Sequence, residues 1–297
     1  MPKEPDTAKT LRRPDGATIA YRCSSTSAVP TGMIVLIHGM ASNLTRWSEF
    51  VRNTTLRRNW AIVRLDLRGH GASPVRRRLS MARWCDDIAA ILDAECHPRA
   101  VLVGHCLGAN IALQFASRFP QKTQGLVLIE PILPDAQSTT LRIARTLRPL
   151  ILAMATGVRI LNRIGIRRRR IPALDLAELD RITRLTMAQD HDSESLTRRY
   201  ASPWQDLRYT PSANYLDDLA AVTGPLPPFA RLQDVPALAL LSTGAAFSRL
   251  ERTRALLAKM HGCRVVTLES RHWIPTEAPD AMRQAIDRWC ADLPAPR

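Results

Sequence analysis

Residues 100–113 read AVLVGHCLGANIAL and contain the feature that decides the fold. The apolar run that opens this stretch is typical of a buried strand, and its last five residues are typical of a helix. Between them, Gly104 and Gly108 flank Cys106 in a Gly-x-Cys-x-Gly turn. Such a turn strains its central residue and exposes that side chain above a sheet, and the glycines are needed because a Cβ there would collide with neighbouring backbone. The stretch therefore predicts a strand, a sharp turn and a helix, with Cys106 presented at the turn.

Cys106 stands where turns of this kind usually carry a serine nucleophile. It is expected at the N-terminus of a helix, where unpaired N–H groups and the helix dipole favour a negatively charged sulfur. A thiolate is a strong nucleophile and depends less than a serine on a carboxylate behind its base. The alternatives are a site that has lost its activity, or a small core residue, since buried free cysteine is common. We expect Cys106 to be the nucleophile because its partners follow elsewhere in the chain.

A second apolar run, residues 33–37, ends in His38, Gly39 and Met40. A strand that ends in His-Gly upstream of the elbow predicts half of an oxyanion hole. One backbone N–H would come from Met40 and the other from Leu107. We interpret His38 as a structural hydrogen-bonding residue rather than a catalyst.

The candidate general base lies near the C-terminus. The strand-like run of residues 264–268 is followed by His272, on a loop before a last predicted helix. A general base needs such a loop to bring its imidazole toward the elbow. His70 and His105 lie inside turn motifs and have weaker claims, so His272 is expected to be the base.

These motifs occur in the order and spacing of the α/β-hydrolase superfamily, which the chain resembles. It is most similar to the esterase, enol-lactonase and haloperoxidase-like branch. The resemblance rests on the His-Gly strand end, the Asp-x-Arg-Gly-His-Gly-x-Ser loop at residues 66–73, the elbow and the late histidine. It covers residues 10–131 and 232–295, and it implies nucleophilic acyl transfer on an α/β fold while saying little about the substrate.

Strands alternate with helices along the chain, which favours a mostly parallel sheet with helices on both faces. The alternation breaks over residues 132–231, which predicts a helical cap, or lid, inserted between two core strands. The expected organisation is one hydrolase core built from residues 1–131 and 232–297, with the cap between them. Core helices are predicted over residues 80–95, 106–119, 248–260 and 276–291.

The acid of a catalytic triad is missing from its usual place. The family usually carries it after the strand that follows the cap, and the spacing there leads to Phe247. A minority of members carry the acid one strand earlier, and there Glu130 ends an apolar strand. A carboxylate in that place would hold the imidazole of His272 in the right tautomer. The alternatives are that Glu130 pairs with an Arg of the cap, that Asp135 is the acid, or that a Cys106–His272 dyad acts alone.

The formal net charge of the chain is +15. No nucleic-acid-binding module and no aromatic interleaving accompany this charge, so nucleic acid is not an expected partner. The polar residues 1–6 lack the apolar core of a signal peptide. The six cysteines show neither paired nor metal-type spacing. The chain is therefore expected in the cytoplasm, without a metal or other cofactor.

The predicted cap carries the charge asymmetry, because residues 131–170 hold nine Arg against one acid, Asp135. Pro149 is expected to kink or restart the first cap helix. One face of that helix is apolar, with Leu141, Ala144, Leu147 and Ile151. The apolar underside would receive an acyl chain. The Arg-rich rim would meet an anionic acyl carrier, such as a phosphopantetheine-type arm or coenzyme A, or an anionic membrane surface.

The sequence thus predicts a hydrolase that acts on an ester or thioester with an apolar acyl group. Cys106 would attack the carbonyl, the oxyanion hole would hold the developing charge, and His272 would carry the proton. A cysteine acyl-enzyme is itself a thioester, so the alternative is an acyltransferase or polyester-synthase-like enzyme with another acceptor. A second alternative is a non-catalytic binding protein on a hydrolase fold, for which Phe247 is the best argument.

Overall fold

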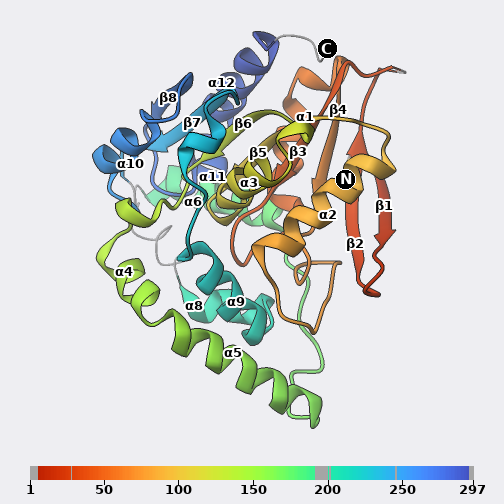
Figure 1. Cartoon of the computed structure of the whole chain (residues 1–297), viewed down its shortest axis with the longest axis vertical. Helices are drawn as coiled ribbons and strands as arrows, with labels where there is room; N and C mark the ends of the chain where they lie inside the picture. The colour runs from red at the N-terminus through yellow and green to blue at the C-terminus, as the bar shows by residue number, and fades with distance from the viewer. Residues whose placement is uncertain (1–5, 28, 191–199, 201, 245, 294–297) are drawn as a thin grey trace.

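The apolar runs of the sequence become the strands of one central sheet. The computed structural model describes residues 6–27, 29–190, 200, 202–244 and 246–293. Within these residues, eight strands form a single sheet in the order β1-β2-β4-β3-β5-β6-β7-β8 (Figure 1). Their bounds are β1 Thr7–Arg12, β2 Thr18–Ser24, β3 Gly32–Ile37, β4 Trp60–Leu65, β5 Ala100–His105, β6 Thr123–Ile129, β7 Ala237–Ser242 and β8 Cys263–Leu268.

The sheet is antiparallel at one edge and parallel through the rest. The β1–β2 hairpin pairs antiparallel with β4, and every pair from β4 to β8 is parallel. Parallel strands need crossover connections, which place helices on the faces of the sheet. The predicted α/β fold with a mostly parallel sheet is confirmed.

Helices cover both faces of the sheet, so the inner strands are apolar on both sides. Alternate residues of each strand point to opposite faces: Val35 and Leu102 join one apolar cluster, and Ile34 and Val101 join the other. The first cluster packs under α2 Met81–Ala94, α3 Leu107–Arg118 and α10 Leu250–Leu257. The second packs under α1 Ser48–Asn53 and α12 Pro279–Ala291.

The predicted core helices are present with adjusted ends. Helix α2 begins after Ser80, whose hydroxyl accepts from the backbone N–H of Arg83. The helix predicted over residues 276–291 is two helices, α11 Ile274–Glu277 and α12. Pro279 explains the break, because it cannot donate a backbone hydrogen bond and it forces Ala278 out of the helical region, to φ −133°.

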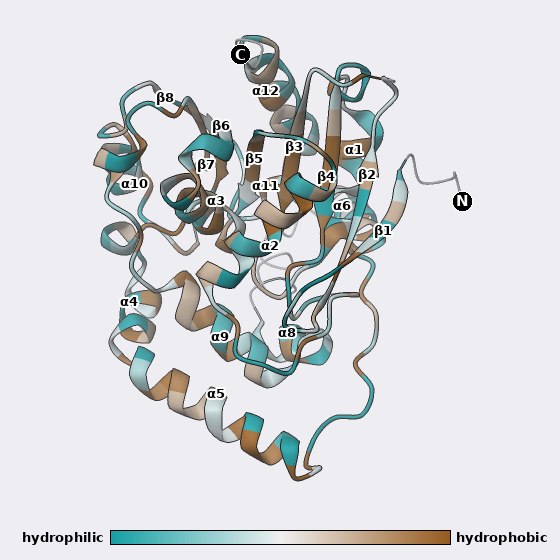
Figure 2. Cartoon of the chain, turned by 45° about the vertical axis from the view of Figure 1, so that its right-hand side comes forward, coloured by the Kyte–Doolittle hydropathy of each residue, from teal (hydrophilic) through white to brown (hydrophobic). Residues whose placement is uncertain are grey.

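Residues 132–231, between β6 and β7, form what is called here the insertion. Its helices are α4 Thr139–Thr146, α5 Arg148–Arg163, α6 Leu176–Asp190, α8 Pro203–Tyr209 and α9 Ser212–Val222. Helix α5 runs along the outer edge of the molecule, and α9 lies between it and the rest of the fold (Figures 1 and 2). None of the helices in the described part of the chain has the length and apolar character needed to cross a bilayer.

One expectation about the apolar face of the first cap helix is wrong. Leu141 packs against the main core and Ile151 is buried, but Leu147 is 46% exposed. The reason is that the helix restarts, with α4 ending at Thr146 and α5 carrying Pro149 in its first turn, as expected for that proline. Leu147 is the junction residue and turns away from the core.

The close approach of Gly108 to β3 predicts a strong effect of a single methyl group. An ideal Cβ on Gly108 would lie 2.3 Å from the carbonyl oxygen of Ile37. Gly108→Ala should therefore lower the free energy of unfolding by more than about 2 kcal/mol. Gly157, inside α5, has nothing within 4 Å of such an atom, so Gly157→Ala should raise it by about 0.5–1 kcal/mol. Urea unfolding of the two variants measures both changes, and a Gly108→Ala variant as stable as wild type would contradict the packing.

Candidate active site

Cys106 lies at a strained turn between β5 and α3. Its backbone has φ 53° and ψ −114°, a conformation that residues other than glycine rarely adopt. Cys106 is the N-cap residue of α3. The flanking glycines make the turn possible, because a Cβ on Gly104 would lie 2.2 Å from the carbonyl oxygen of Gly108. The thiol is partly exposed. The structure therefore places Cys106 at the elbow that the sequence predicts.

His272 and Glu130 meet at the carboxyl edge of the sheet. His272 follows β8, and its Nδ1 lies 3.2 Å from Oε2 of Glu130, with both side chains buried. The Cys106 side chain lies close enough to the imidazole to raise its pKa. Because Nδ1 faces Glu130, Nε2 is the nitrogen left for the sulfur. The structure thus brings the three candidate residues together although they are far apart in sequence.

Glu130 is fixed by backbone as well as by His272. It has φ 49°, and its Oε1 accepts a 2.7 Å hydrogen bond from the backbone N–H of Ser242 at the end of β7. The predicted alternative partner, an Arg of the insertion, does not contact it in the described part of the chain. Asp135 lies outside this group, since its side chain is 71% exposed and its ion-pair partner is Arg145 at 3.8 Å.

Phe247, at the position where the family usually has an acid, contacts the imidazole through its ring. The Phe247 and His272 rings meet edge to face, with centroids 4.7 Å apart at 84°. Trp273 packs against both rings. The Nε2 of His105 hydrogen bonds the carbonyl oxygen of His272 at 3.0 Å. Aromatic packing and this bond fix the orientation of the imidazole from the sides that Glu130 does not reach.

The pKa of His272 is raised to about 10. Burial by itself lowers it, because a charged imidazole loses its hydration. The negative charge of the Cys106 sulfur, the hydrogen bond to that sulfur, and the Glu130 carboxylate together outweigh burial. The charges of its two partners therefore favour the protonated form of the imidazole.

The predicted oxyanion donors are free to act. Among described residues, neither the N–H of Met40 nor that of Leu107 donates to another group. Gly39 brings this end of β3 against the elbow, since a Cβ on Gly39 would lie 3.3 Å from Cβ of Cys106. The residue before Met40 therefore lies against Cys106, and Leu107 follows Cys106 directly in the chain.

His38 has the structural role expected of it. Its Nε2 accepts from the backbone N–H of Leu67 at 3.0 Å, so its Nδ1 carries the proton and donates to the carbonyl oxygen of Gly39 at 2.8 Å. Burial, followed by the nearby His70, holds its pKa well below the usual range. A neutral imidazole with both nitrogens bonded to backbone is not available as a base.

The Gly-rich loop 66–73 is also structural. Asp66 accepts from the backbone N–H groups of Leu44 and Ala72, each at 2.7 Å. Arg68 pairs with Asp87 at 2.6 Å and also with Asp15. These bonds hold the loop beside the turn that follows Met40.

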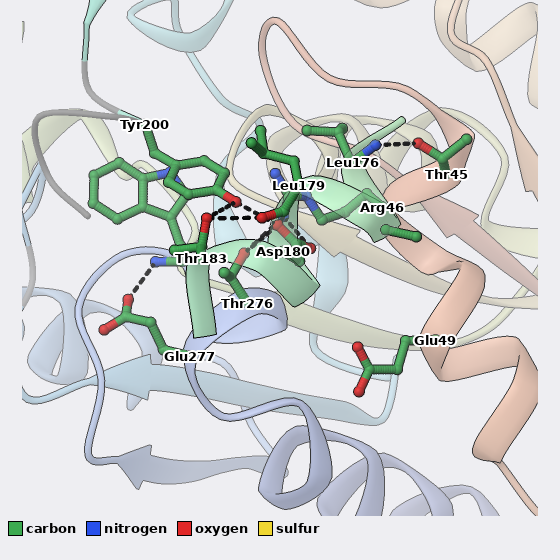
Figure 3. Close-up of polar contacts among 12 residues, drawn as sticks. Thr45, Arg46, Glu49, Leu176, Leu179, Asp180, Thr183, Tyr200, Thr276 and Glu277 are labelled. Carbon is green, nitrogen blue, oxygen red and sulfur yellow. Dashed lines mark hydrogen bonds and ion pairs between the residues drawn. The ribbon is translucent and has the colours of Figure 1, made fainter. Parts of the chain in front are cut away.

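Figure 3 shows a buried polar cluster that sequence reasoning did not foresee. Arg46, after the oxyanion turn, pairs with Asp180 of α6 at 2.6 Å and donates to Oγ1 of Thr276 at 2.7 Å. Tyr200 donates to Asp180 at 2.7 Å. Thr276 follows His272 by four residues, so this cluster joins the insertion to both halves of the candidate site. No short-range signal marks it, because its members are up to 230 residues apart.

A groove of about 1770 Å³ lies beside the site, between the insertion and the β1–β2 side of the core. It reaches the turn of residues 41–45, directly after Met40, but neither Cys106 nor His272 lines it. Its only acidic lining residue is the buried Asp66. Its wall includes arginines that make no ion pair with a described carboxylate: Arg76, Arg77, Arg163, Arg167, Arg168 and Arg169.

Across the described ranges, no three His, Cys, Asp or Glu side chains gather in a way that could hold a metal ion. The chemistry that the geometry supports is that of a thiol, an imidazole and a carboxylate at an oxyanion hole.

The geometry predicts how His272 titrates. Its pKa should lie near 10 in the wild type and should fall in Cys106→Ala and in Glu130→Gln, because each change removes a charge that favours the protonated ring. Asp135→Asn is the matched control, since Asp135 is exposed and does not contact the ring. The pH dependence of ¹⁵N shifts of labelled histidine measures all four proteins. A wild-type pKa in the ordinary range, or an equal fall in the control, would contradict the contacts.

Comparison with known proteins supports the family suggested by these motifs. A pimeloyl-[acyl-carrier protein] methyl ester esterase of Neisseria meningitidis is 35% identical over 95 residues, which are 32% of this chain and 34% of that protein. An uncharacterized protein of Mycobacterium tuberculosis is 37% identical over 100 residues, 32% of this chain and 28% of that protein. The chain thus spans about a third of the length of these curated relatives.

The fold is also found among solved structures. The enol-lactonase from Burkholderia xenovorans superimposes with a TM-score of 0.68 at 18% identity, over 96% of this chain and 100% of that one. The sequence matches the Alpha/beta hydrolase family over residues 34–285. Because that match spans most of the chain, the protein belongs to the alpha/beta hydrolase family.

Proposed function

We propose that this protein hydrolyses an ester or thioester with an apolar acyl group, through a covalent intermediate on Cys106. The observation that carries the proposal is the buried contact between His272 and Glu130, with Cys106 beside them at the strained turn that starts α3. Phe247, the best argument for a non-catalytic protein, loses its force because Glu130 supplies the carboxylate that Phe247 cannot.

The reaction follows from the positions of these groups. The Cys106 sulfur attacks the carbonyl carbon, and the Met40 and Leu107 amides stabilise the oxyanion that forms. The carbon–oxygen or carbon–sulfur bond to the leaving group then breaks, and His272 gives its proton to that group. Water, deprotonated by His272, attacks the acyl thioester, which releases the carboxylic acid and returns the sulfur and imidazole to their starting state.

An apolar acyl group is supported by the surroundings of the thiol. Cys106 is one of the partly buried apolar side chains that pack against the larger core cluster, and Met40, Leu141, Leu219, Phe229 and Phe247 belong to the same group. Phe247 also packs edge to face on His272. Partly buried apolar surface on this face of the sheet is what an acyl chain would cover.

Cys106 should be the residue that is acylated and alkylated. Incubation with acyl thioesters and aryl esters should add one acyl mass to the wild type and none to Cys106→Ala. Iodoacetamide near neutral pH should label Cys106 ahead of Cys23, Cys85, Cys263 and Cys290, whose pKa values burial raises to about 11 or 12. Cys96 is exposed, so the labelling is best done in a Cys96→Ser background.

The rates of ester or thioester hydrolysis of variants at the other site residues should follow the role of each residue. Cys106→Ala and His272→Ala should be the least active, Glu130→Gln intermediate, and Asp135→Asn close to wild type. The loss in Glu130→Gln should be smaller than the ~10⁴-fold of a serine triad, because a thiolate needs less help. An active Cys106→Ala would refute the proposal, and transfer of the acyl group to an added alcohol or amine in preference to water would favour the acyltransferase alternative.

Catalytic efficiency should rise with the length of the acyl chain. Each methylene that enters the apolar surroundings of Cys106 contributes up to ~0.8 kcal/mol, or about fourfold in kcat/KM. Straight-chain esters from acetyl to octanoyl with one common leaving group test this. A flat or falling series would remove the case for an apolar acyl site and leave the covalent mechanism untouched.

A further inference from the structure

The insertion exposes a continuous apolar stripe along its outermost helices. Along α5 the side chains are spaced by three, four or seven residues, which places them on one helical face, and two more lie on α4 and at its junction with α5. They are between 45% and 69% exposed, and the stripe consists of Ile143, Leu147, Leu150, Met154, Leu161 and Ile164. Helix α5 lies at the rim of the molecule, where Figure 2 shows hydrophobic residues interleaved with hydrophilic ones. Contiguous apolar surface of this kind marks an interaction site.

The stripe cannot turn inward, because the opposite face of α5 is anchored. Ile151 and Ala155 are buried beneath the helix. Arg148 donates to the carbonyl oxygen of Ala220 at 2.8 Å, and Arg159 pairs with the buried Asp217, so α5 is fixed on α9. The stripe is therefore exposed because these contacts fix the orientation of α5 on α9.

The segment that carries the stripe is rich in arginine and has no acidic residue of its own to neutralise the charge. Residues 136–174 contain no Asp or Glu. Within the described ranges, five arginines of this segment make neither an ion pair nor a side-chain hydrogen bond: Arg142, Arg163, Arg167, Arg169 and Arg170. All five are exposed. An exposed apolar face bordered by unpaired arginines is the pattern of a helix that lies in the surface of an anionic bilayer.

We propose that α4, α5 and the basic segment after them dock this protein on an anionic lipid surface, independently of its catalytic chemistry. The stripe enters the boundary between headgroups and acyl chains, and the arginines contact lipid phosphates. A second copy of the chain is a poorer occupant, because a twofold contact would bring the same arginines face to face. An anionic acyl carrier would match the charges alone and would leave the apolar stripe in water.

Co-sedimentation with vesicles tests the proposal. The wild type should bind vesicles of equal parts phosphatidylglycerol and phosphatidylcholine, bind pure phosphatidylcholine at least tenfold more weakly, and lose binding as salt is added. Leu150→Glu with Met154→Glu should weaken binding more than tenfold. Arg167→Gln, Arg169→Gln and Arg170→Gln together should weaken it on the order of a hundredfold, at about fivefold per charge.

Leu185→Glu on α6 is the matched control, because Leu185 is 53% exposed and Leu150 is 55% exposed. The control should bind vesicles like the wild type, and every variant should keep wild-type unfolding and hydrolysis of a soluble ester. Equal binding by the Leu150/Met154 variant, or equal loss in the control, would overturn the proposal. It would also fail if the chain bound no vesicles but formed a dimer, or bound an acyl-carrier protein, through the same residues.

Discussion

The geometry of the candidate site depends on a contact between two backbones that only glycine permits. Gly104 and Gly108 let α3 begin directly against β5 and β3. A Cβ on either glycine would lie only 2.2–2.3 Å from a backbone carbonyl oxygen of the neighbouring segment. That approach goes with φ 53° at Cys106, and the N–H of Leu107 donates to no group among the described residues. The same turn therefore sets the positions of the Cys106 sulfur and of the Leu107 amide together.

A second residue with a positive φ, Glu130, lies at the end of the neighbouring strand, β6. Glu130 follows β6 at φ 49°, and its Oε1 accepts a hydrogen bond from the backbone N–H of Ser242, the last residue of β7. Three neighbouring parallel strands thus position the Cys106 thiol, the Glu130 carboxylate and the N–H that holds this carboxylate. Position 247 carries a ring, and Phe247 packs edge-on against His272, so the imidazole meets a carboxylate at one nitrogen and an aromatic side chain beside it.

The features of the fold that the sequence predicts are those that depend on neighbouring residues in the chain. The elbow at residues 104–108 is foreseeable because its glycines have a steric reason, and the central strands because they are apolar runs. The position of Glu130 beside His272 is foreseeable only as one of several alternatives, since 142 residues separate them. Leu147 is misplaced because the expected helical face extends across the restart that Pro149 predicts, and the break falls at Leu147 itself, between α4 and α5. The Arg46 cluster and the seating of α5 depend on tertiary contacts that no spacing encodes.

The cluster around Arg46 bears on how the insertion can act. Arg46 and Asp180 are both nearly inaccessible, and the removal of one partner of such a pair costs on the order of 3–5 kcal/mol. If α6 lifted away, the Arg46 charge would stay behind between the oxyanion turn and Thr276, without its carboxylate. Helix α6 is therefore better described as a fixed wall that aligns both halves of the site than as a hinged cover. Among the described residues, none of α6 lines the groove beside residues 41–45, so that groove is open without any movement of α6.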